Sequence, residues 1–225
     1  MGVFFCARQG DRALFDDKTW HHITRVLRYH PGEIIFGTDG RGKRWKIRLD
    51  KAGGEILGEE MVPPPLFSIF LGCALPKGQR QDVLIEKIVE LGVDGFYPLI
   101  CERSIVVPRG KKDRWDRVSK SACEQSGRCF CPEIFSPMRL KDLLDEWEGE
   151  IFFAHPGEEP LALSPPFAWK RVLVLVGPEG GFTDEEVSVL KQRGARGFSL
   201  GDNILRVETA GIIAVGLFAI ARQRY

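Results

Sequence analysis

The sequence has no long hydrophobic run. Its longest nearly unbroken apolar stretch, Ala210 to Ala221, has 12 of the 225 residues, whereas a membrane-spanning helix needs about 20. The first residues also lack the basic start and the apolar region of about 7–15 residues that mark a secretory signal. We therefore expect a protein that has no membrane segment and acts in the cytoplasm.

Cysteines are few, and their spacing favours neither disulfides nor metal. The six thiols include no C-x-x-C pair, and a chain with 44% hydrophobic residues can bury a core without disulfides. Cys123, Cys129 and Cys131 match no zinc pattern, and the nearest histidine is His155. Because no Cys and His stand at a spacing that supports nucleophilic catalysis, hydrolase chemistry is disfavoured. The sequence predicts reduced thiols and no metal site.

The chain also lacks an excess of either charge. Lys and Arg number 32 against 31 Asp and Glu, so no whole-chain attraction to nucleic acid or membrane is expected. The charges are segregated: residues 18–51 hold nine basic and three acidic side chains, residues 103–120 seven and two, and residues 142–159 seven acidic and no basic ones. Two basic segments in a neutral protein suit contacts to a phosphate backbone. From charge counts alone, a solvated surface is the favoured interpretation.

Three prolines divide the sequence. Pro63 to Pro65 remove backbone donors and favour an extended spacer, so we place a domain boundary there. Before it, extended runs separated by turn residues predict a small β-rich domain over residues 1–62. One helix, containing Thr19, Val26 and Tyr29, is expected to interrupt these runs. The expected strands are 3–7, 33–37, 45–49 and 55–57.

After the prolines, apolar strands alternate with amphipathic helices, which is typical of an α/β domain with a mainly parallel sheet. We expect this domain over residues 66–225. Thr183 and Glu186 predict a capping box for a helix that runs to about Arg193. The last helix, about Thr209 to Arg222, is apolar on nearly all sides, which favours a subunit interface. The expected strands are 66–74, 95–100, 151–154, 172–176 and 197–200, and the other expected helices are 79–91, 115–126 and 140–147.

A glycine-rich loop follows one of these strands. The segment Val172 to Glu186, VLVLVGPEGGFTDEE, combines a buried-type strand, small residues and a capped helix. In open α/β sheets ligands bind beyond the carboxyl ends of strands, and small residues let them approach the backbone. The loop has neither the G-x-x-x-x-G-K-[ST] nor the G-x-G-x-x-G spacing, so it does not indicate a nucleoside triphosphate or a dinucleotide. Taken alone, it also fits a tight strand-to-helix turn.

A second loop of this kind, LGDNILRVETAG, spans Leu200 to Gly211. Because sequential strands are usually neighbours in a sheet, we expect the two loops to lie side by side and form a cleft. Arg206 could hold a phosphate or carboxylate there, and Glu208 could accept hydrogen bonds from a ligand, although a plain capping pair is the alternative. The segment SACEQSGR adds Glu124 and Arg128 near a helix C-terminus, where a surface patch is the alternative.

Five motifs, in order and spacing, resemble those of the RsmE family. The paired C-terminal signature of the family is similar to VGPEGGFTDEEV and LGDNILRVETA. The start of its N-terminal domain is similar to HHITRVLRYHPGE followed by TDGRG. Its mid-chain motifs are similar to KGQRQDVLIEKIVELGVDGFYPLICERS and SACEQSGR, so the resemblance covers essentially the whole chain.

The resemblance implies a fold and an activity. Members of the RsmE family are SPOUT-class RNA methyltransferases that use S-adenosylmethionine to methylate N3 of a uridine in 16S ribosomal RNA, position 1498 in the usual bacterial numbering. The implied substrate is the small ribosomal subunit. The implied fold is a PUA-like β-barrel RNA-binding domain over residues 1–62 and an α/β methyltransferase domain with a trefoil knot over residues 66–225. The family also implies a homodimer with the active site near the subunit interface.

Site residues follow from matching positions. For this reaction we expect Arg206 or Arg128 to stabilise the developing uridinate and Glu124 or Glu208 to accept the N3 proton. The residues expected to bind S-adenosylmethionine are Ala154, His155, Pro156, Val176, Gly177, Pro178, Glu179, Gly180, Gly181, Leu200, Gly201, Ile204, Leu205 and Thr209. Members often carry Arg before the Phe-Phe pair, where this chain has Val3. RNA contacts are therefore expected from Arg8, Arg25, Arg28 and Arg103.

Alternative functions remain open at this point. The target could be another RNA base or transfer RNA. The chain could also be a non-catalytic, RNA-binding ribosome assembly factor with a vestigial pocket. Binding of S-adenosylmethionine that is abolished by Gly177→Trp would favour the enzyme, and no binding would favour the assembly factor. A dinucleotide-dependent oxidoreductase has only the α/β layering in its favour, since G-x-G-x-x-G is absent.

Overall fold

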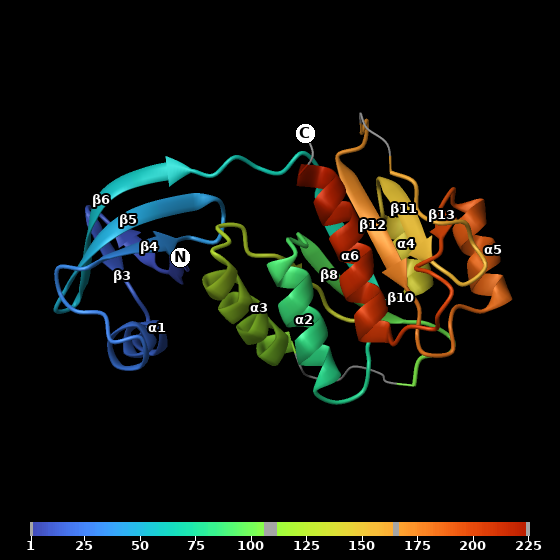
Figure 1. Cartoon of the computed structure of the whole chain (residues 1–225), viewed down its shortest axis with the longest axis horizontal. Helices are drawn as coiled ribbons and strands as arrows, with labels where there is room; N and C mark the ends of the chain where they lie inside the picture. Colours follow the sequence, from blue (N-terminus) through green and yellow to red (C-terminus); the bar gives the residue numbers. More distant parts are fainter. Residues whose placement is uncertain (1, 106–111, 164–166, 224–225) are drawn as a thin grey trace. The chain divides into compact units, whose positions relative to one another are not determined.

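A computed structural model describes residues 2–105, 112–163 and 167–223, and Figure 1 shows the order of its elements. The chain forms two compact units, with unit 1 comprising the chain up to Pro64 together with Lys120–Cys131. Unit 2 comprises Pro65–Ser119 and the chain from Pro132 onward. The division within the first part of the chain falls among the three prolines.

The segment 120–131 contributes contacts to unit 1 that its position in the sequence does not suggest. The carbonyl of Glu124 accepts a hydrogen bond from the amide of Val3 at 3.0 Å, and the carbonyl of Cys129 accepts one from Gly42 at 2.8 Å. Val3 is 1% exposed. Val3, at the position where members of the RsmE family often carry arginine, is thus part of the buried interior of unit 1.

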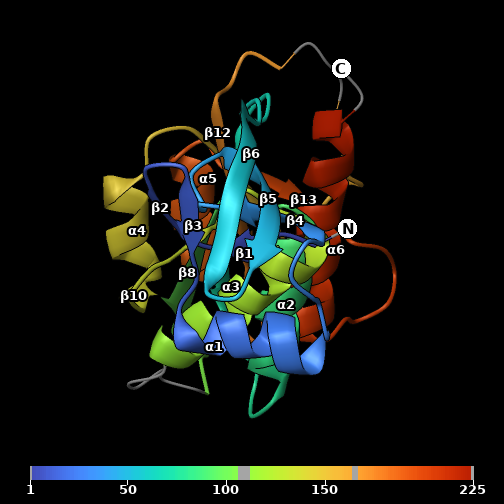
Figure 2. The ribbon, with the colours of Figure 1, turned by 90° about the vertical axis from the view of Figure 1, so that its left-hand side faces the viewer.

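Unit 1 is built on a six-stranded sheet in the order β1-β4-β5-β6-β3-β2, drawn in Figure 2 with α1 below the strands. β1 pairs with β4 in parallel, and the other pairs are antiparallel. Along β5, Trp45, Ile47 and Leu49 alternate with exposed or half-exposed residues, so one face of the sheet covers the core. The strands are β1 Phe4–Phe5, β2 Ala7–Gln9, β3 Arg12–Leu14, β4 Ile34–Thr38, β5 Lys43–Asp50 and β6 Gly53–Met61.

The helix of unit 1 is shorter than expected. α1 (Asp17–His21) continues as a π-helical turn, η1 (His22–Val26), and leaves Tyr29 outside. Arg28, with φ of 58°, is the only non-glycine residue in the described ranges that adopts a positive φ. Because this left-handed conformation cannot continue a right-handed helix, the chain turns there.

Asp16 caps this helix, and we expect Asp16→Ala to lower the free energy of unfolding by about 1 kcal/mol. Its carboxylate accepts a hydrogen bond from the amide of Thr19 at 2.7 Å and pairs with Lys120 at 2.9 Å. These two partners lower the pKa of Asp16 from 3.8 to about 2. The stabilisation by the Asp16 carboxylate is therefore complete at pH values above the pKa that this carboxyl has in the unfolded chain. It is lost as the pH falls through the lower pKa of the folded protein.

Urea unfolding at neutral pH and near pH 3 tests this prediction. The difference between wild type and Asp16→Ala should shrink at the acidic pH. Asp17→Ala, which retains the cap, is the matched control and should have the smaller effect at neutral pH. An equal loss in both variants at both pH values would contradict the assignment of the cap.

Unit 2 contains a parallel sheet in the order β10-β8-β7-β12-β11-β13, with β9 also paired to β8. Its central strands are nearly continuous apolar runs, as expected for a sheet covered on both faces. The strands are β7 Ser68–Ala74, β8 Gly95–Ile100, β9 Glu133–Ile134, β10 Met138–Arg139, β11 Glu150–Ala154, β12 Arg171–Val176 and β13 Arg196–Phe198. The fold class expected from the sequence, a PUA-like domain with a SPOUT-like parallel-sheet domain, is confirmed.

Helices cover both faces of this sheet. α2 (Arg80–Glu90) and α6 (Val207–Gln223) pack side by side, and α6 also contacts β7 and β12 (Figure 1). On the other face, apolar residues of α4 (Leu140–Glu146) and α5 (Asp184–Gln192) join Leu173 and Leu175 in one buried cluster. The remaining helix is α3 (Lys112–Ser126).

One expected neighbour relation in the sheet is wrong. β12 and β13 follow each other in sequence, but β11 lies between them and pairs in parallel with both. The two glycine-containing loops therefore do not emerge from adjacent strands. The end of β11 is placed between them and brings a third segment to the same edge.

Candidate active site

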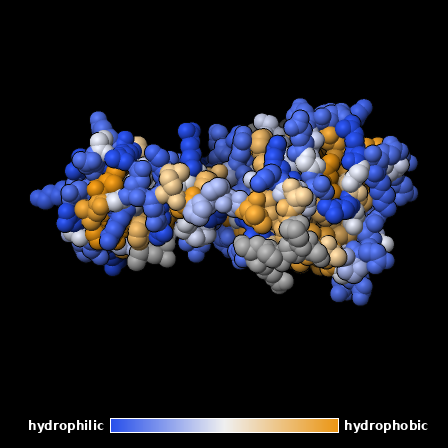
Figure 3. Space-filling model, turned by 90° about the horizontal axis from the view of Figure 1, so that it is seen from above, coloured by the Kyte–Doolittle hydropathy of each residue, from blue (hydrophilic) through white to orange (hydrophobic). Residues whose placement is uncertain are grey.

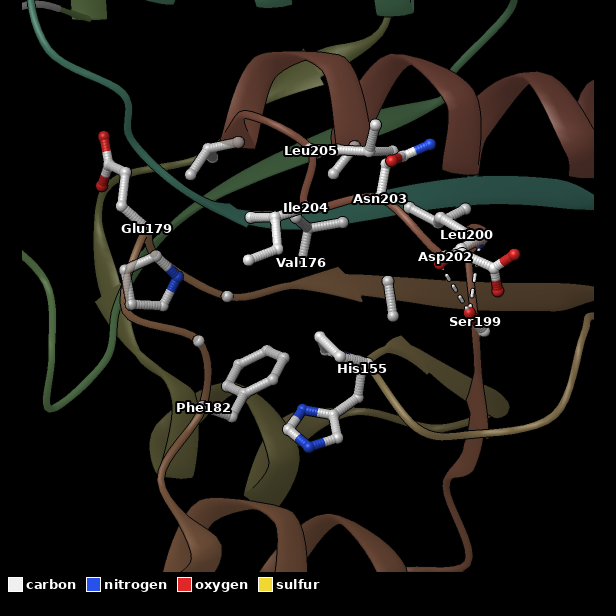
Figure 4. Close-up of a pocket in the computed structure, with 18 residues that line it drawn as sticks. His155, Val176, Glu179, Phe182, Ser199, Leu200, Asp202, Asn203, Ile204 and Leu205 are labelled. Carbon is white, nitrogen blue, oxygen red and sulfur yellow. Dashed lines mark hydrogen bonds between the residues drawn. The ribbon is translucent and has the colours of Figure 1, made fainter.

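Three strand ends and the start of one helix form a cavity in unit 2. β11, β12 and β13 run in parallel and end at Ala154, Val176 and Phe198, so their following loops meet at one edge of the sheet (Figure 4). The cavity measures about 170 Å³, less than the ~300–1,000 Å³ of sites that enclose a drug-sized ligand. A ligand of that size would extend beyond the mouth.

Most residues expected to bind the cofactor line this cavity. Twelve of the fourteen do so: Ala154, His155, Pro156, Val176, Gly177, Pro178, Glu179, Gly181, Leu200, Gly201, Ile204 and Leu205. Gly180 and Thr209 are not among the lining residues. Six further residues line the cavity and were not predicted from the sequence: Phe182, Ser199, Asp202, Asn203, Val207 and Ala210.

Helix geometry explains part of this difference. α6 begins at Val207, and residues three apart on a helix share a face. Val207 and Ala210 therefore face the cavity together, whereas Thr209 lies on another side of the first turn. Placing the start of α6 correctly would have predicted this pair.

The backbone of the GPEGG loop leaves little room. The amide of Gly181 donates to the carbonyl of Pro178 at 2.8 Å, which closes a turn, and Gly181 has φ of 70°. A Cβ added to Gly177 would lie 3.1 Å from the amide nitrogen of Phe182. A Cβ at Gly177 would therefore require the backbone of the loop to shift by a few tenths of an ångström.

The loop is held from outside by Arg103. One guanidinium nitrogen donates to the carbonyl of Gly180 at 2.8 Å and lies 3.4 Å from that of Phe182. The Arg103 stem would contact a Cβ on Gly180 at 3.3 Å. Gly180 therefore faces Arg103. The sequence predicts Arg103 as an RNA contact, and in the structure its guanidinium contacts the loop.

The capping box next to this loop is present as predicted. The hydroxyl of Thr183 accepts from the amide of Glu186 at 3.1 Å, and the Glu186 carboxylate accepts from the amide of Thr183 at 2.9 Å. The other Glu186 oxygen accepts from the amide of Glu102 at 3.0 Å. Glu186 thus connects α5, the GPEGG loop and the segment that carries Arg103.

His155 presents an unpartnered polar atom at the cavity. Its amide donates to the carbonyl of Phe198 at 3.0 Å, and its ring lies beside that of Phe182 in Figure 4. The ring nitrogen Nδ1 is buried and has no hydrogen-bond partner among the described residues. Buried polar atoms are normally paired, so a ligand with a hydrogen-bonding group fits this wall.

Glu208 is a buried carboxylate in the first turn of α6. The residue is 8% exposed, and its Oε1 lies 3.6 Å from a guanidinium nitrogen of Arg80. Its Oε2 is buried without a partner in the described part of the chain. Burial raises the pKa of the Cys73 thiol, and the charges of Glu179 and Glu208 add to this effect. A half-paired buried carboxylate is costly for folding and marks a functional candidate.

None of the four expected catalytic residues, Glu208 included, is among the residues that line the cavity. Arg206 is exposed, and its carbonyl accepts from the amide of Ala210 at 2.8 Å. Glu124 and Arg128 belong to unit 1 and do not line the cavity. The Glu124 carboxylate accepts from the amide of Phe5 at 3.3 Å, and burial raises its pKa. Glu124 therefore connects α3 to β1.

The expected RNA-binding cations have different surroundings. Arg8 pairs with Glu59 at 2.6 Å, Arg25 lines a groove in unit 1, and Arg28 occupies the strained turn after η1. Part of the second basic segment, residues 106–111, lies outside the described residues. Within the described ranges, no helix is long and apolar enough to cross a membrane, and no group of His, Cys, Asp and Glu could hold a metal.

One hydrolase-like pattern occurs beside the cavity. Residues Gly197 to Gly201 have the spacing G-x-S-x-G. In a nucleophile elbow the serine leads from a strand directly into a helix and is activated by histidine. Here the hydroxyl of Ser199 bonds with the carbonyl and amide of Gly201 at 3.2 and 3.1 Å, and a loop follows. The geometry does not support a serine nucleophile.

Comparisons with known families match both units. The family model described as RNA methyltransferase domain matches residues 63–219. The model described as RNA methyltransferase PUA domain matches residues 15–57.

Individual relatives match over most of the chain. Ribosomal RNA small subunit methyltransferase E of Synechocystis is 33% identical over 87% of this chain and 68% of its own length. The protein of that name from Aquifex aeolicus is 32% identical over 96% of this chain and 98% of its own. A crystal structure of ribosomal RNA small subunit methyltransferase E from Neisseria gonorrhoeae bound to S-adenosylmethionine is 31% identical, with a TM-score of 0.86 over 98% of this chain and 97% of that one.

Proposed function

The chain belongs to the family of ribosomal RNA small subunit methyltransferases, and on that premise we propose that it methylates N3 of a specific uridine in 16S rRNA with S-adenosylmethionine. The target is the uridine at position 1498 in the usual bacterial numbering. The cavity at the ends of β11, β12 and β13 carries this proposal, because twelve residues expected for the cofactor line it. Action on the small ribosomal subunit would place the protein in the cytoplasm.

The cavity suits S-adenosylmethionine, which supplies an electrophilic methyl group on sulfur. We assign a hydrogen bond with a polar group of the ligand to His155, which lines the cavity and whose buried Nδ1 has no partner among the described residues. Val176, Ile204 and Leu205 offer apolar surface, and the small residues Gly177 and Gly181 let a ligand approach the backbone. Glu179 points away from His155 and Phe182 in Figure 4. We therefore assign contact at this position to the backbone of the loop.

We assign the proton transfer to two groups at the start of α6. Uridine N3 carries a proton that must leave before N3 can act as a nucleophile. We assign acceptance of this proton to Glu208, whose Oε2 has no partner among the described residues. We assign stabilisation of the uridinate oxygen to Arg206, which is exposed directly before α6. Glu124 and Arg128 remain the alternatives for these two roles.

A homodimer completes this proposal. α6 leaves Ile213, Leu217 and Ile220 exposed by 39, 37 and 53%, and Ile204 at the cavity is 95% exposed. Figure 3 shows that hydrophobic surface lies between hydrophilic side chains on one face of the molecule. A second copy that covers them would also cover the part of a ligand that the small cavity leaves outside. Sedimentation velocity tests this, and a monomer at micromolar concentration would contradict it.

The trefoil knot is also part of the proposal. β12 follows β11 in sequence but is inserted between β7 and β11, an order that suits a chain threaded through an earlier loop. The resemblance to SPOUT-class enzymes supplies the remaining support.

Methyl transfer from labelled S-adenosylmethionine tests the function. The substrates are small ribosomal subunits that lack this modification and the same rRNA without proteins, and the nucleosides are identified by mass spectrometry. Label recovered as 3-methyluridine is the expected result, and the two substrates show whether assembly is required. Label on another nucleoside would identify a different RNA target. No label and no cofactor binding would favour a non-catalytic assembly factor.

We expect Arg103→Ala to weaken S-adenosylmethionine binding about tenfold, because the loss of a charge-assisted hydrogen bond of ~1.5–3 kcal/mol releases the GPEGG loop. Calorimetric titration measures this. Arg103→Lys should restore part of the affinity. Arg139→Ala, at an exposed position on β10, is the matched control. Unchanged cofactor affinity together with weaker RNA binding would return Arg103 to the RNA-contact role expected from sequence.

A further inference from the structure

Unit 1 contains a groove outside the site described above. It measures about 420 Å³, within the ~300–1,000 Å³ typical of small-molecule sites. Trp20, Tyr29 and His30 supply rings to its lining, and Arg25 and Lys51 supply positive charge. We call these five residues and the space between them the aromatic groove.

Two rings of the aromatic groove are held in place by the core. Trp20 stacks on Phe15 with ring centroids 5.9 Å apart, and Tyr29 meets Phe4 edge-on at 6.4 Å. Both residues are only partly buried and pack against the hydrophobic cluster of unit 1. Rigid aromatic surface of this kind costs little entropy when it receives a flat ligand.

An irregular backbone positions these rings. The π-helical turn η1 and the positive φ of Arg28 stand directly before Tyr29, whose amide donates to the carbonyl of Ile23 at 3.0 Å. Both features cost stability and occur preferentially where function requires them. The irregular backbone at η1 and Arg28 thus positions Tyr29 and His30.

The charge of the aromatic groove is complementary to a phosphate. Arg25 and Lys51 line it together with one acidic residue, Asp50. The Asp50 carboxylate is paired with Arg12 at 2.8 Å, so its charge is offset. The surrounding segment 18–51 has nine basic against three acidic side chains.

We propose that the aromatic groove binds one unstacked nucleotide of the RNA, with its base on the rings of Tyr29 and Trp20 and its phosphate near Arg25 and Lys51. This inference rests on the proposed function, since it assigns a second contact to the same RNA. An aromatic ring accepts any base by stacking, whereas phosphate contacts give affinity without sequence information. The groove would therefore anchor an unpaired nucleotide at a distance from the methylated base.

Binding of a fluorescent single-stranded RNA decamer, and of the same decamer without bases, tests the proposal on the full chain. Wild type should bind the base-bearing RNA about tenfold or more tightly than the abasic one. Tyr29→Leu, which keeps apolar packing, should lower this preference without changing abasic binding, because only the ring of Trp20 then remains for the base. Tyr29→Phe should retain it. A base preference that Tyr29→Leu leaves unchanged would overturn the proposal.

A charge variant tests the phosphate contact. Arg25→Gln should weaken binding of both RNAs equally and lower the slope of log affinity against log salt by about 0.7. Arg48→Gln, whose charge is paired with Glu55 at 2.6 Å, is the matched control and should change the slope less. Equal slopes in wild type and Arg25→Gln would overturn the phosphate assignment.

Methyl transfer by the same variants separates the two proposals. If wild type methylates rRNA but Tyr29→Leu leaves the base preference unchanged, the result supports the proposed function and contradicts the proposal for the aromatic groove. If wild type shows the Tyr29-dependent base preference but transfers no methyl group, the result supports the proposal for the aromatic groove and contradicts the proposed function. Thermal unfolding of each variant identifies loss of fold, and Tyr29→Phe then provides the comparison.

Discussion

Gly177→Val should weaken S-adenosylmethionine binding by about tenfold to hundredfold, because overpacking costs ~1–3 kcal/mol and each 1.4 kcal/mol is a factor of ten. A Cβ at this position would lie 3.1 Å from the amide nitrogen of Phe182 and 3.3 Å from the carbonyl carbon of Gly181. Both are backbone atoms, so the loop must move. Because valine adds two methyl groups beyond this Cβ, its effect should exceed that of Gly177→Ala.

Calorimetric titration with S-adenosylmethionine measures the effect. Gly58→Ala is the matched control, since a Cβ there meets no atom within 4 Å and its φ is not positive. It should leave affinity unchanged. If Gly177→Val also keeps wild-type affinity while the protein stays folded, the GPEGG loop is not the cofactor wall. The cofactor would then have to bind outside the cavity at the ends of β11, β12 and β13.

Local patterns made most of the fold predictable. The apolar runs at 172–176 and 151–154 predict buried parallel strands, and both are strands of the central sheet. The capping box at Thr183 follows from two side chains three residues apart. Such features depend on neighbours in sequence. For the same reason the two loops after β12 and β13 could be identified from the residues alone, whereas residues 154–156 were assigned to the site through the family resemblance.

Long-range order was less predictable. Nothing local indicates that β11 lies between β12 and β13, because strand order depends on contacts between segments that are distant in sequence. The contact of Arg103 with Gly180 joins segments 77 residues apart, and a lone arginine in a basic segment looks like an RNA contact. The helix that should have included Tyr29 ended early because Arg28 adopts a positive φ, which arginine rarely does.

The family resemblance indicated the reaction and the cofactor, which neither the hydrophobic pattern nor the residue spacing could assign. A glycine-rich loop after a strand suits many ligands, and fold alone does not assign a reaction. The ordered set of motifs narrowed the chain to RNA methyltransferases, and the match over residues 63–219 confirms this family. The roles of Arg206 and Glu208 remain predictions that depend on the chemistry of the α6 start.

Glu208→Gln should lower kcat about 10²–10⁴-fold while leaving S-adenosylmethionine affinity nearly unchanged, because the amide cannot accept the N3 proton. The substitution conserves the shape of a side chain that is 8% exposed. Single-turnover methylation of rRNA measures the chemical step. Glu86→Gln, an exposed carboxylate on α2 that pairs with Lys87, is the control and should keep wild-type turnover.

The pH dependence distinguishes a proton acceptor from a structural residue. If Glu208 removes the proton, the rate of Glu208→Gln should rise with pH as solvent takes over this role, and the gap to wild type should narrow. A residue that only stabilises the fold would lower the thermal midpoint and leave the shape of the pH profile unchanged. Wild-type turnover in Glu208→Gln would move the assignment to Glu124, whose burial raises its pKa. The partly buried carboxylate of unit 1 would then be the group that takes the proton.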